Sequence, residues 1–161
     1  MSSLVSYVCK KYFRMKFSFG KLKSALQKNN ANNEVENAQY LETLKAAVED
    51  KPFAISERNI MFTGMKELAG YFYFRVVVFG QFKIKTFKGA ELTITCKNTE
   101  IKLKSDMDEL ASDYGMIPNS FITSIDFEID KNQIEKLNTT KIESLRVVSK
   151  KQDVTFTALK S

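Results

Sequence analysis

Apolar and polar side chains alternate along most of residues 71–104, and this stretch decides how the rest of the chain is interpreted. Alternation with a period of two is typical of β-strands, whose successive side chains point to opposite faces. Gly80, Gly89 and Asn98 interrupt the alternation at intervals of nine residues, and tight turns favour glycine and asparagine. The stretch is therefore predicted to form four strands joined by three hairpin turns.

The same pattern predicts how these strands pair. Gly80 and Gln81 suit a two-residue turn, and a three-residue turn around a left-handed Gly89 keeps apolar residues opposite one another. A third turn is expected at Asn98–Thr99. The expected pairs are Phe79 with Phe82, Val77 with Ile84, Ile94 with Ile84, Cys96 with Phe82, Cys96 with Ile101, and Ile94 with Leu103.

One face of this meander is predicted to be apolar, and the other carries lysine and threonine. The apolar face would hold Phe79, Phe82, Ile84, Ile94, Cys96, Ile101 and Leu103. The opposite face would carry two rows, Lys83–Thr95–Lys102 and Lys85–Thr93–Lys104. The first strand is apolar on both sides, with Phe72, Phe74, Val76 and Val78 on the lysine side and Val77 and Phe79 on the other. Such a strand is covered on both faces, so another element should pack over it.

The flanking segments predict further strands and helices. A helix over residues 36–50, ended by Pro52, is the candidate to cover the doubly apolar strand. Before the meander we expect strands at 53–55 and 59–63 and a turn with one helical turn at 64–70. After it we expect a short helix at 105–111, an irregular stretch at 113–119, a strand at 120–130, a helix opened by an Asp130–Gln133 capping box, and a hairpin of 141–149 with 154–159.

These elements predict an α+β fold. Its centre would be an antiparallel β-meander sheet of about eight strands, folded into a sandwich or partial barrel, with N-terminal helices packed on it. We expect two parts, a basic amphipathic N-terminal arm at residues 1–28 and a single α+β domain at residues 29–161. A chain of 161 residues is long enough for one ordinary hydrophobic core.

The N-terminal arm holds all of the positive excess of the chain. Residues 1–28 carry seven lysine or arginine side chains and no acid, whereas the whole chain has a net charge of +6, so residues 29–161 sum to −1. Apolar residues recur in the arm every three or four positions, as on a helix, while residues 13–19 also alternate as on a strand. Such a segment can pack on the sheet with its lysines in water, or bind an anionic membrane or nucleic acid.

The composition excludes several kinds of catalytic and metal-binding site. The chain has no histidine, which excludes Ser-His-Asp and Cys-His catalysis and histidine metal ligands. Cys9 and Cys96 have no motif spacing, so no disulfide framework is expected and a reducing cytoplasm is the default location. No transmembrane segment is predicted, because no apolar run approaches the ~20 residues of a membrane helix. No signal peptide is predicted, because Lys10, Lys11 and Arg14 interrupt the apolar N-terminus. We expect no cofactor and no metal site, and we interpret the chain as a non-enzyme.

Three carboxylates, Asp126, Glu128 and Asp130, share one face of the predicted strand at 120–130. Same-face positions on a strand are about 6–7 Å apart, and nothing nearby in sequence completes a set of cation ligands. The preferred interpretation is that this strand neighbours residues 100–104, with Asp126 or Glu128 facing Lys102 or Lys104.

Three functions are compatible with this pattern. The first is a non-enzymatic binding or accessory domain that docks to an anionic surface or to a protein. The alternative is a nucleic-acid-binding protein that uses the basic arm and the lysine face, and the third is an enzyme of an unfamiliar class. The candidate anion-binding residues are Lys83, Lys85, Lys102, Lys104, Lys10, Lys11, Arg14 and Lys16.

Overall fold

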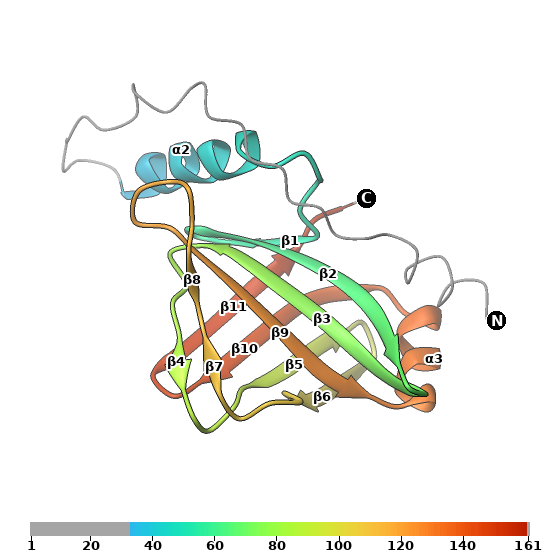
Figure 1. Cartoon of the computed structure of the whole chain (residues 1–161). Helices are drawn as coiled ribbons and strands as arrows, with labels where there is room; N and C mark the ends of the chain where they lie inside the picture. The colour runs from blue at the N-terminus through green and yellow to red at the C-terminus, as the bar shows by residue number, and fades with distance from the viewer. Residues whose placement is uncertain (1–32, 161) are drawn as a thin grey trace.

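The computed structural model describes residues 33–160, and its centre is one curled antiparallel sheet of nine strands, a half-barrel (Figure 1). The strands follow the order β6-β5-β10-β11-β1-β2-β3-β9-β8, and β4 and β7 form a separate pair. The strands are Ala54–Ser56 (β1), Asn59–Leu68 (β2), Tyr71–Gly80 (β3), Lys85–Thr86 (β4), Glu91–Cys96 (β5), Thr99–Lys104 (β6), Leu110–Ala111 (β7), Asp113–Tyr114 (β8), Phe121–Ile129 (β9), Ile142–Ser149 (β10) and Gln152–Ala158 (β11). The helices are Asn33–Ala46 (α2) and Lys131–Thr139 (α3). The α+β class and the partial-barrel curvature agree with the prediction.

The main hydrophobic core combines side chains from both halves of the curled sheet. Alternate residues of β9 are buried in it, namely Ile125, Phe127 and Ile129, as the period of that strand predicts. Of the seven side chains predicted to share the apolar face, six belong to this core: Phe82, Ile84, Ile94, Cys96, Ile101 and Leu103. The prediction was wrong for Phe79, which is buried in a second cluster.

Strand β3 is covered on both faces, as its doubly apolar sequence predicted. Val76 and Val78 belong to the main core, whereas Val77 and Phe79 belong to a second cluster with Leu44 of α2. The predicted helix therefore covers this strand, although it begins and ends about three residues earlier than expected. The assignment of the two faces was wrong, because Val76 and Val78 share the core with Ile84 and Ile94, and Val77 and Phe79 do not.

The face assignment failed because the first hairpin of the predicted meander does not form. Strand β3 pairs with β2 on one side and with β9 on the other, so no edge remains for residues 82–84. The main chain leaves the sheet after Gly80: the Gln81 N–H donates to the Arg58 carbonyl (3.1 Å) and the Phe82 N–H donates to Asn59 Oδ1 (2.7 Å). The following residues pair with β7 instead.

The other two turns are correct in part. Gly89 has a φ of 70°, as predicted, but β5 then pairs with β10 and β6, so the predicted pair of Ile94 with Ile84 is wrong. The β5–β6 hairpin turns at residues 97–98, one position earlier than predicted, and it pairs Ile94 with Ile101. The predicted register is thus shifted by two residues, which leaves every side chain on its expected face.

Two further local predictions were wrong and two were right. Residues 64–68 extend β2, and the turn with its positive φ lies at Ala69 and Gly70. Residues 105–111 form no helix, because Ser105 bridges to β9 and Leu110 pairs in β7. The capping box of Asp130 and Gln133 opens α3, and the β10–β11 hairpin forms where it was expected.

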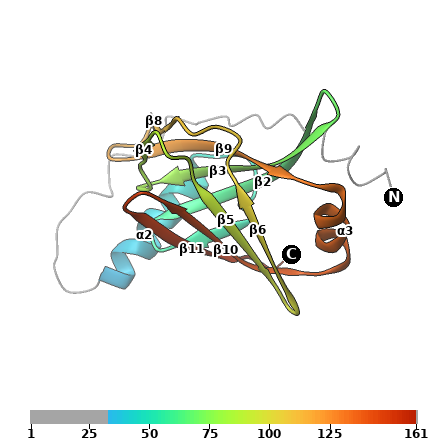
Figure 2. The same cartoon turned by 90° about the horizontal axis from the view of Figure 1, so that it is seen from below.

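The helices are not packed on the sheet as an N-terminal group. Helix α2 precedes the sheet and covers one face of β2 and β3, but α3 lies between β9 and β10 at one end of the barrel (Figure 2). Ile134 and Leu137 of α3 pack on the main core there. The predicted arm at residues 1–28 lies outside the described residues, so the two-part domain division stays a prediction. Neither helix of residues 33–160 is long and apolar enough to cross a membrane.

Candidate binding groove

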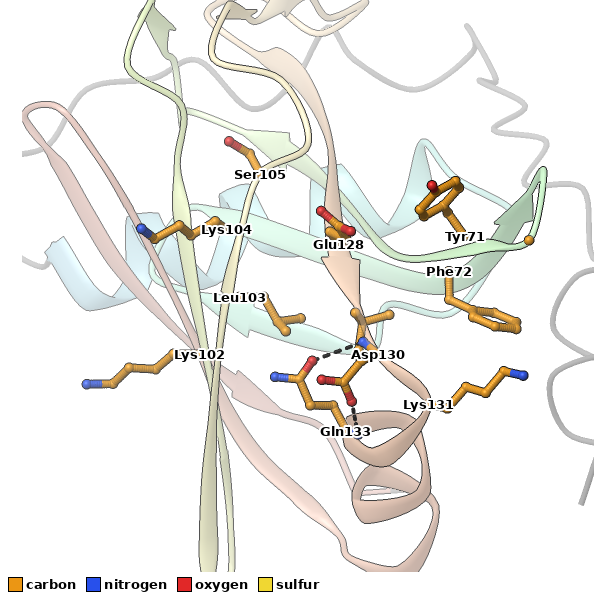
Figure 3. Close-up of a pocket in the computed structure, with 12 residues that line it drawn as sticks. Tyr71, Phe72, Lys102, Leu103, Lys104, Ser105, Glu128, Asp130, Lys131 and Gln133 are labelled. Carbon is orange, nitrogen blue, oxygen red and sulfur yellow. Dashed lines mark hydrogen bonds between the residues drawn. The ribbon is translucent and has the colours of Figure 1, made fainter.

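The sheet does not close into a barrel, and a groove marks the place where closure stops. Strands β6 and β9 meet at a single bridge between Ser105 and Phe127, beside which the Asp106 N–H donates to the Asp126 carbonyl (2.8 Å). Beyond this bridge the strands diverge around a groove of about 480 Å³ (Figure 3). It is lined by residues 70–72 of the β2–β3 hairpin, 102–105 of β6 and its end, 128–130 of β9, and Lys131 and Gln133 of α3.

The main chain of β6 presents to the groove the edge that faces away from β5, and β9 pairs with this edge only at the bridge. The Ser105 N–H donates to the Ala90 carbonyl (2.9 Å), toward β5, whereas the Asp106 N–H points the other way, toward β9. Main-chain groups alternate in direction along an antiparallel strand, so the N–H and C=O groups of Lys102 and Lys104 face away from β5. Among the described residues, β9 meets this edge at the isolated Ser105–Phe127 bridge, and no strand is paired with β6 at Lys102.

Apolar side chains form the deep side of the groove. Leu103 is buried and points from β6 toward the start of α3 (Figure 3). Ile129, opposite it on β9, is also buried, and Phe72 is partly buried on the hairpin wall. The Lys131 ammonium lies 5.9 Å from the centre of the Phe72 ring. At the tip of this hairpin Tyr71 is 61% exposed, which is unusual for so large a ring and leaves it free for contact.

Charged side chains flank this apolar floor. Lys102 and Lys104 extend from β6 on the side away from β9, and Glu128 and Asp130 stand on the opposite wall (Figure 3). The Asp130 carboxylate caps α3 by accepting from the Gln133 N–H (2.8 Å). The groove therefore joins a free strand edge, an apolar floor and a lysine-bearing rim.

The bridge also fixes a register across the groove. Continued past Ser105 and Phe127, it sets Lys104 opposite Glu128, Leu103 opposite Ile129 and Lys102 opposite Asp130. Opposite charges and apolar residues thus fall opposite one another at each of these positions, although β6 and β9 pair only at the bridge. The edge of β6 is therefore suited to a partner strand that alternates acidic and apolar residues.

An ion cluster on β9, β3 and β2 lies outside the lining of the groove. The Asp126 carboxylate accepts from Arg75 Nε (2.6 Å) and Nη2 (2.8 Å) on β3, and from Lys66 Nζ (3.3 Å) on β2. The predicted neighbourhood of β9 and residues 100–104 is correct only at the bridge, whose register places Glu128 opposite Lys104. The alternative with Asp126 facing a lysine of β6 was wrong, because β9 pairs with β3 along its length. Burial acts to raise the pKa of Asp126, but Arg75 and Lys66 together outweigh it and lower this pKa below its ordinary value.

Asp126→Asn is therefore expected to destabilise the fold by about 1–3 kcal/mol at neutral pH, because hydrogen bonds to a charged group are lost around a half-buried site. A folded-state pKa below the unfolded one means that the carboxylate stabilises the fold above the ordinary pKa of 3.8. This contribution is lost as the pH falls through the lower, folded value. Urea unfolding of both proteins across the acid range measures the difference, which should shrink with acidification.

The matched control for this pair is Asp153→Asn, which breaks a bidentate pair with Arg146 (2.7 and 2.6 Å) on the exposed face of β10–β11. Asp153→Asn should lower the free energy of unfolding by less than Asp126→Asn does, because water screens an exposed ion pair. Equal losses of stability for the two variants would contradict a stabilising role for the Asp126 carboxylate. A loss of stability in Asp126→Asn that does not depend on pH would contradict it as well.

The predicted anion-binding lysines are not brought together. The rows Lys83–Thr95–Lys102 and Lys85–Thr93–Lys104 do not exist, because residues 83–85 do not pair with β5. Lys83 and Lys85 lie on the segment that pairs with β7, and Lys102 and Lys104 lie on β6. The four basic residues Lys10, Lys11, Arg14 and Lys16 lie outside the described residues.

Sequence reasoning named the two lysines of β6 but missed the groove beside them. Its other walls come from Tyr71, Phe72 and Lys131, which are distant in sequence. Within residues 33–160, no group of three or more His, Cys, Asp or Glu side chains is positioned to hold a metal ion.

Comparison with known proteins found no match: no protein-family model fits the chain, and neither the curated proteins nor the solved structures include a significant match to it. Any functional argument for this chain therefore begins from the geometry of its own surfaces.

Proposed function

We propose that this chain is a non-enzymatic binding domain that takes up an extended peptide segment of a partner protein as an added strand on β6. The observation that carries the proposal is the main-chain edge of β6 that is unpaired beyond the Ser105–Phe127 bridge and lies beside an apolar floor. Strand addition to an exposed sheet edge gives affinity through main-chain hydrogen bonds and specificity through alternate side chains. The groove volume of about 480 Å³ lies within the usual range of ligand sites.

The side chains along β6 indicate which peptide sequence should bind there. Side chains of an added strand alternate between the two faces of the sheet. One set would lie over Leu103 and should be apolar, and the other set would lie beside Lys102 and Lys104 and should be acidic. We therefore propose a segment that alternates acidic and apolar residues and runs antiparallel to β6, as every strand of this sheet runs to its neighbour.

The direct test uses a fluorescein-labelled peptide of alternating valine and glutamate and the full chain, with binding followed by anisotropy. The expected result is saturable binding that a peptide of alternating valine and lysine does not show. In antiparallel pairing the residues opposite Lys102 and Lys104 make the hydrogen bonds to β6. N-methylation of the glutamates should then abolish binding, whereas N-methylation of the valines should preserve it.

Two variants of Lys102 distinguish recognition through main-chain hydrogen bonds from recognition through charge. Lys102→Pro removes an N–H that faces the groove and no hydrogen bond to β5, and proline is accepted on edge strands in this orientation. It should abolish peptide binding, whereas Lys102→Ala should weaken binding and lower its salt dependence. Unchanged binding by a folded Lys102→Pro protein, or equal binding of both methylated peptides, would refute strand addition.

A further inference from the structure

Strands β4, β7 and β8 lie on the side of the barrel away from α3 (Figure 1). A second surface in this region combines lysines with exposed aromatic rings. Along residues 83–87 the side chains alternate strictly between the two sides of the chain. Phe82, Ile84 and Thr86 are buried, whereas Lys83, Lys85 and Phe87 are exposed. The chain thus displays two lysines and one phenylalanine in a row at the same-face spacing of a strand.

Two further aromatic rings lie at the Lys83 end of this row. Tyr114 of β8 pairs with Phe121 of β9, and their ring centres are 5.7 Å apart. The Lys83 ammonium lies 4.8 Å from the centre of the Phe121 ring and 5.8 Å from that of Tyr114. Tyr114 is nevertheless 83% exposed, so most of its ring is open to solvent.

The loop that follows Tyr114 is held together by its own hydrogen bonds. The Gly115 N–H donates to the Ser120 carbonyl (2.9 Å), and the Ser120 hydroxyl donates to the Ile117 carbonyl (2.6 Å). Ile117 is buried in the cluster under α2. A side chain at Gly115 would meet the Ser120 hydroxyl and the Phe79 ring, so the loop is closely packed at this point. The main chain that follows Tyr114 is therefore held in place, while most of the Tyr114 ring is exposed.

The local charge is positive on balance. Gln152 Nε2 donates to the Lys83 carbonyl (3.1 Å), which brings the Lys150–Lys151 turn next to the row. The acids nearby are Asp113, which falls opposite Lys83 in the β4–β7 register, and Glu109, which falls opposite Phe87. The carboxylate of Asp153 is already paired with Arg146. A third acid, Asp108, lies beside Gly89. The exposed lysines of this region outnumber these three acids, and they are Lys83, Lys85, Lys88, Lys150 and Lys151.

We infer that this surface binds single-stranded nucleic acid, independently of the groove beside β6. Exposed aromatic rings offer stacking platforms to bases of any sequence, and lysines between the rings contact the phosphates. A base that stacks on Tyr114 displaces the Lys83 ammonium from the ring and leaves it free to pair with a phosphate. A row with lysines between Tyr114 and Phe87 suits a flexible chain that alternates flat rings and negative charges.

The test measures binding of fluorescein-labelled oligothymidylate to the full chain over a range of salt concentrations. Tyr114→Ala should weaken binding roughly tenfold at every salt concentration, since stacking is lost and no charge changes. The Lys83→Ala/Lys85→Ala double variant should reduce the slope of log K against log salt by about 1.4, the value for two lost phosphate contacts on a single strand.

The matched control is Lys102→Ala/Lys104→Ala, which removes the same charge from β6 and should leave this slope unchanged. Thermal unfolding should be unaffected by Tyr114→Ala, because the side chain is exposed. Equal affinity of wild type and a folded Tyr114→Ala protein would overturn the inference. The inference would also be overturned if both lysine double variants reduced the slope of log K against log salt equally, because that would indicate general charge attraction. If Tyr114→Ala abolished binding of the valine–glutamate peptide instead, this surface would belong to a protein partner.

Discussion

Ile94→Ala is expected to destabilise the protein by about 2–5 kcal/mol, the range for removing a large aliphatic side chain from a packed core. Ile94 is fully buried, and β5 lies between two other strands, so the residue pairs with Ile101 on one side and Leu145 on the other. A cavity at this position cannot be filled by a shift of one flanking strand alone. Urea unfolding followed by circular dichroism gives the free energy directly.

The control for this prediction is Glu100→Ala, an exposed position on the neighbouring strand. Its effect should be within about 0.5 kcal/mol of zero, as for most surface substitutions. A loss below 1 kcal/mol for Ile94→Ala would show that β5 is not packed in the core as described.

Which residues are buried could be predicted from the sequence, even where the strand pairing was wrong. Ile94, Ile101 and Leu103 were assigned to the core with a register shifted by two residues. A shift by two keeps every side chain on its face, because the period of a strand is two. Binary patterning therefore predicts burial robustly, and it predicts the partner strand only when the turn is also correct.

The choice of partner strand failed at Gly80 because the deciding contacts are distant in sequence. A glycine between two apolar runs is a sound hairpin signal. In the structure both edges of β3 are occupied, by β2 and by β9. The side chain of Asn59 then caps the departing chain at Phe82, and no local pattern could have indicated that contact.

The candidate groove could be predicted only in part for the same reason. Lys102 and Lys104 were selected from the sequence, and their strand was correctly located. Their importance, however, depends on the point at which the sheet stops closing. That point is set by the Ser105–Phe127 bridge and by α3, which occupies the end of the barrel. Sheet curvature of this kind arises from the sum of many strand twists and leaves no local signal.

Gly80→Ala is expected to be among the most destabilising single substitutions of the described residues. Gly80 has a φ of 150°, a region that residues other than glycine rarely adopt. A Cβ there would collide with the Arg58 carbonyl oxygen and would lie 2.6 Å from Asn59 Oδ1. The backbone strain costs about 1–3 kcal/mol and the overpacking about 1–3 kcal/mol more. The substitution would also disturb the hydrogen bond from the Phe82 N–H to Asn59.

Gly64→Ala is the matched control, since it makes the same chemical change on the strand that pairs with β3. Gly64 lies opposite Arg75 in the same ladder, and a Cβ there would meet no atom within 4 Å. Strands disfavour glycine, so this variant should be neutral or slightly more stable than wild type. Thermal unfolding of the two variants side by side distinguishes a local collision at Gly80 from a general effect of replacing glycine in the sheet. Similar stabilities for both would mean that β3 does not pass from the sheet to residues 82–84 by the tight turn described here.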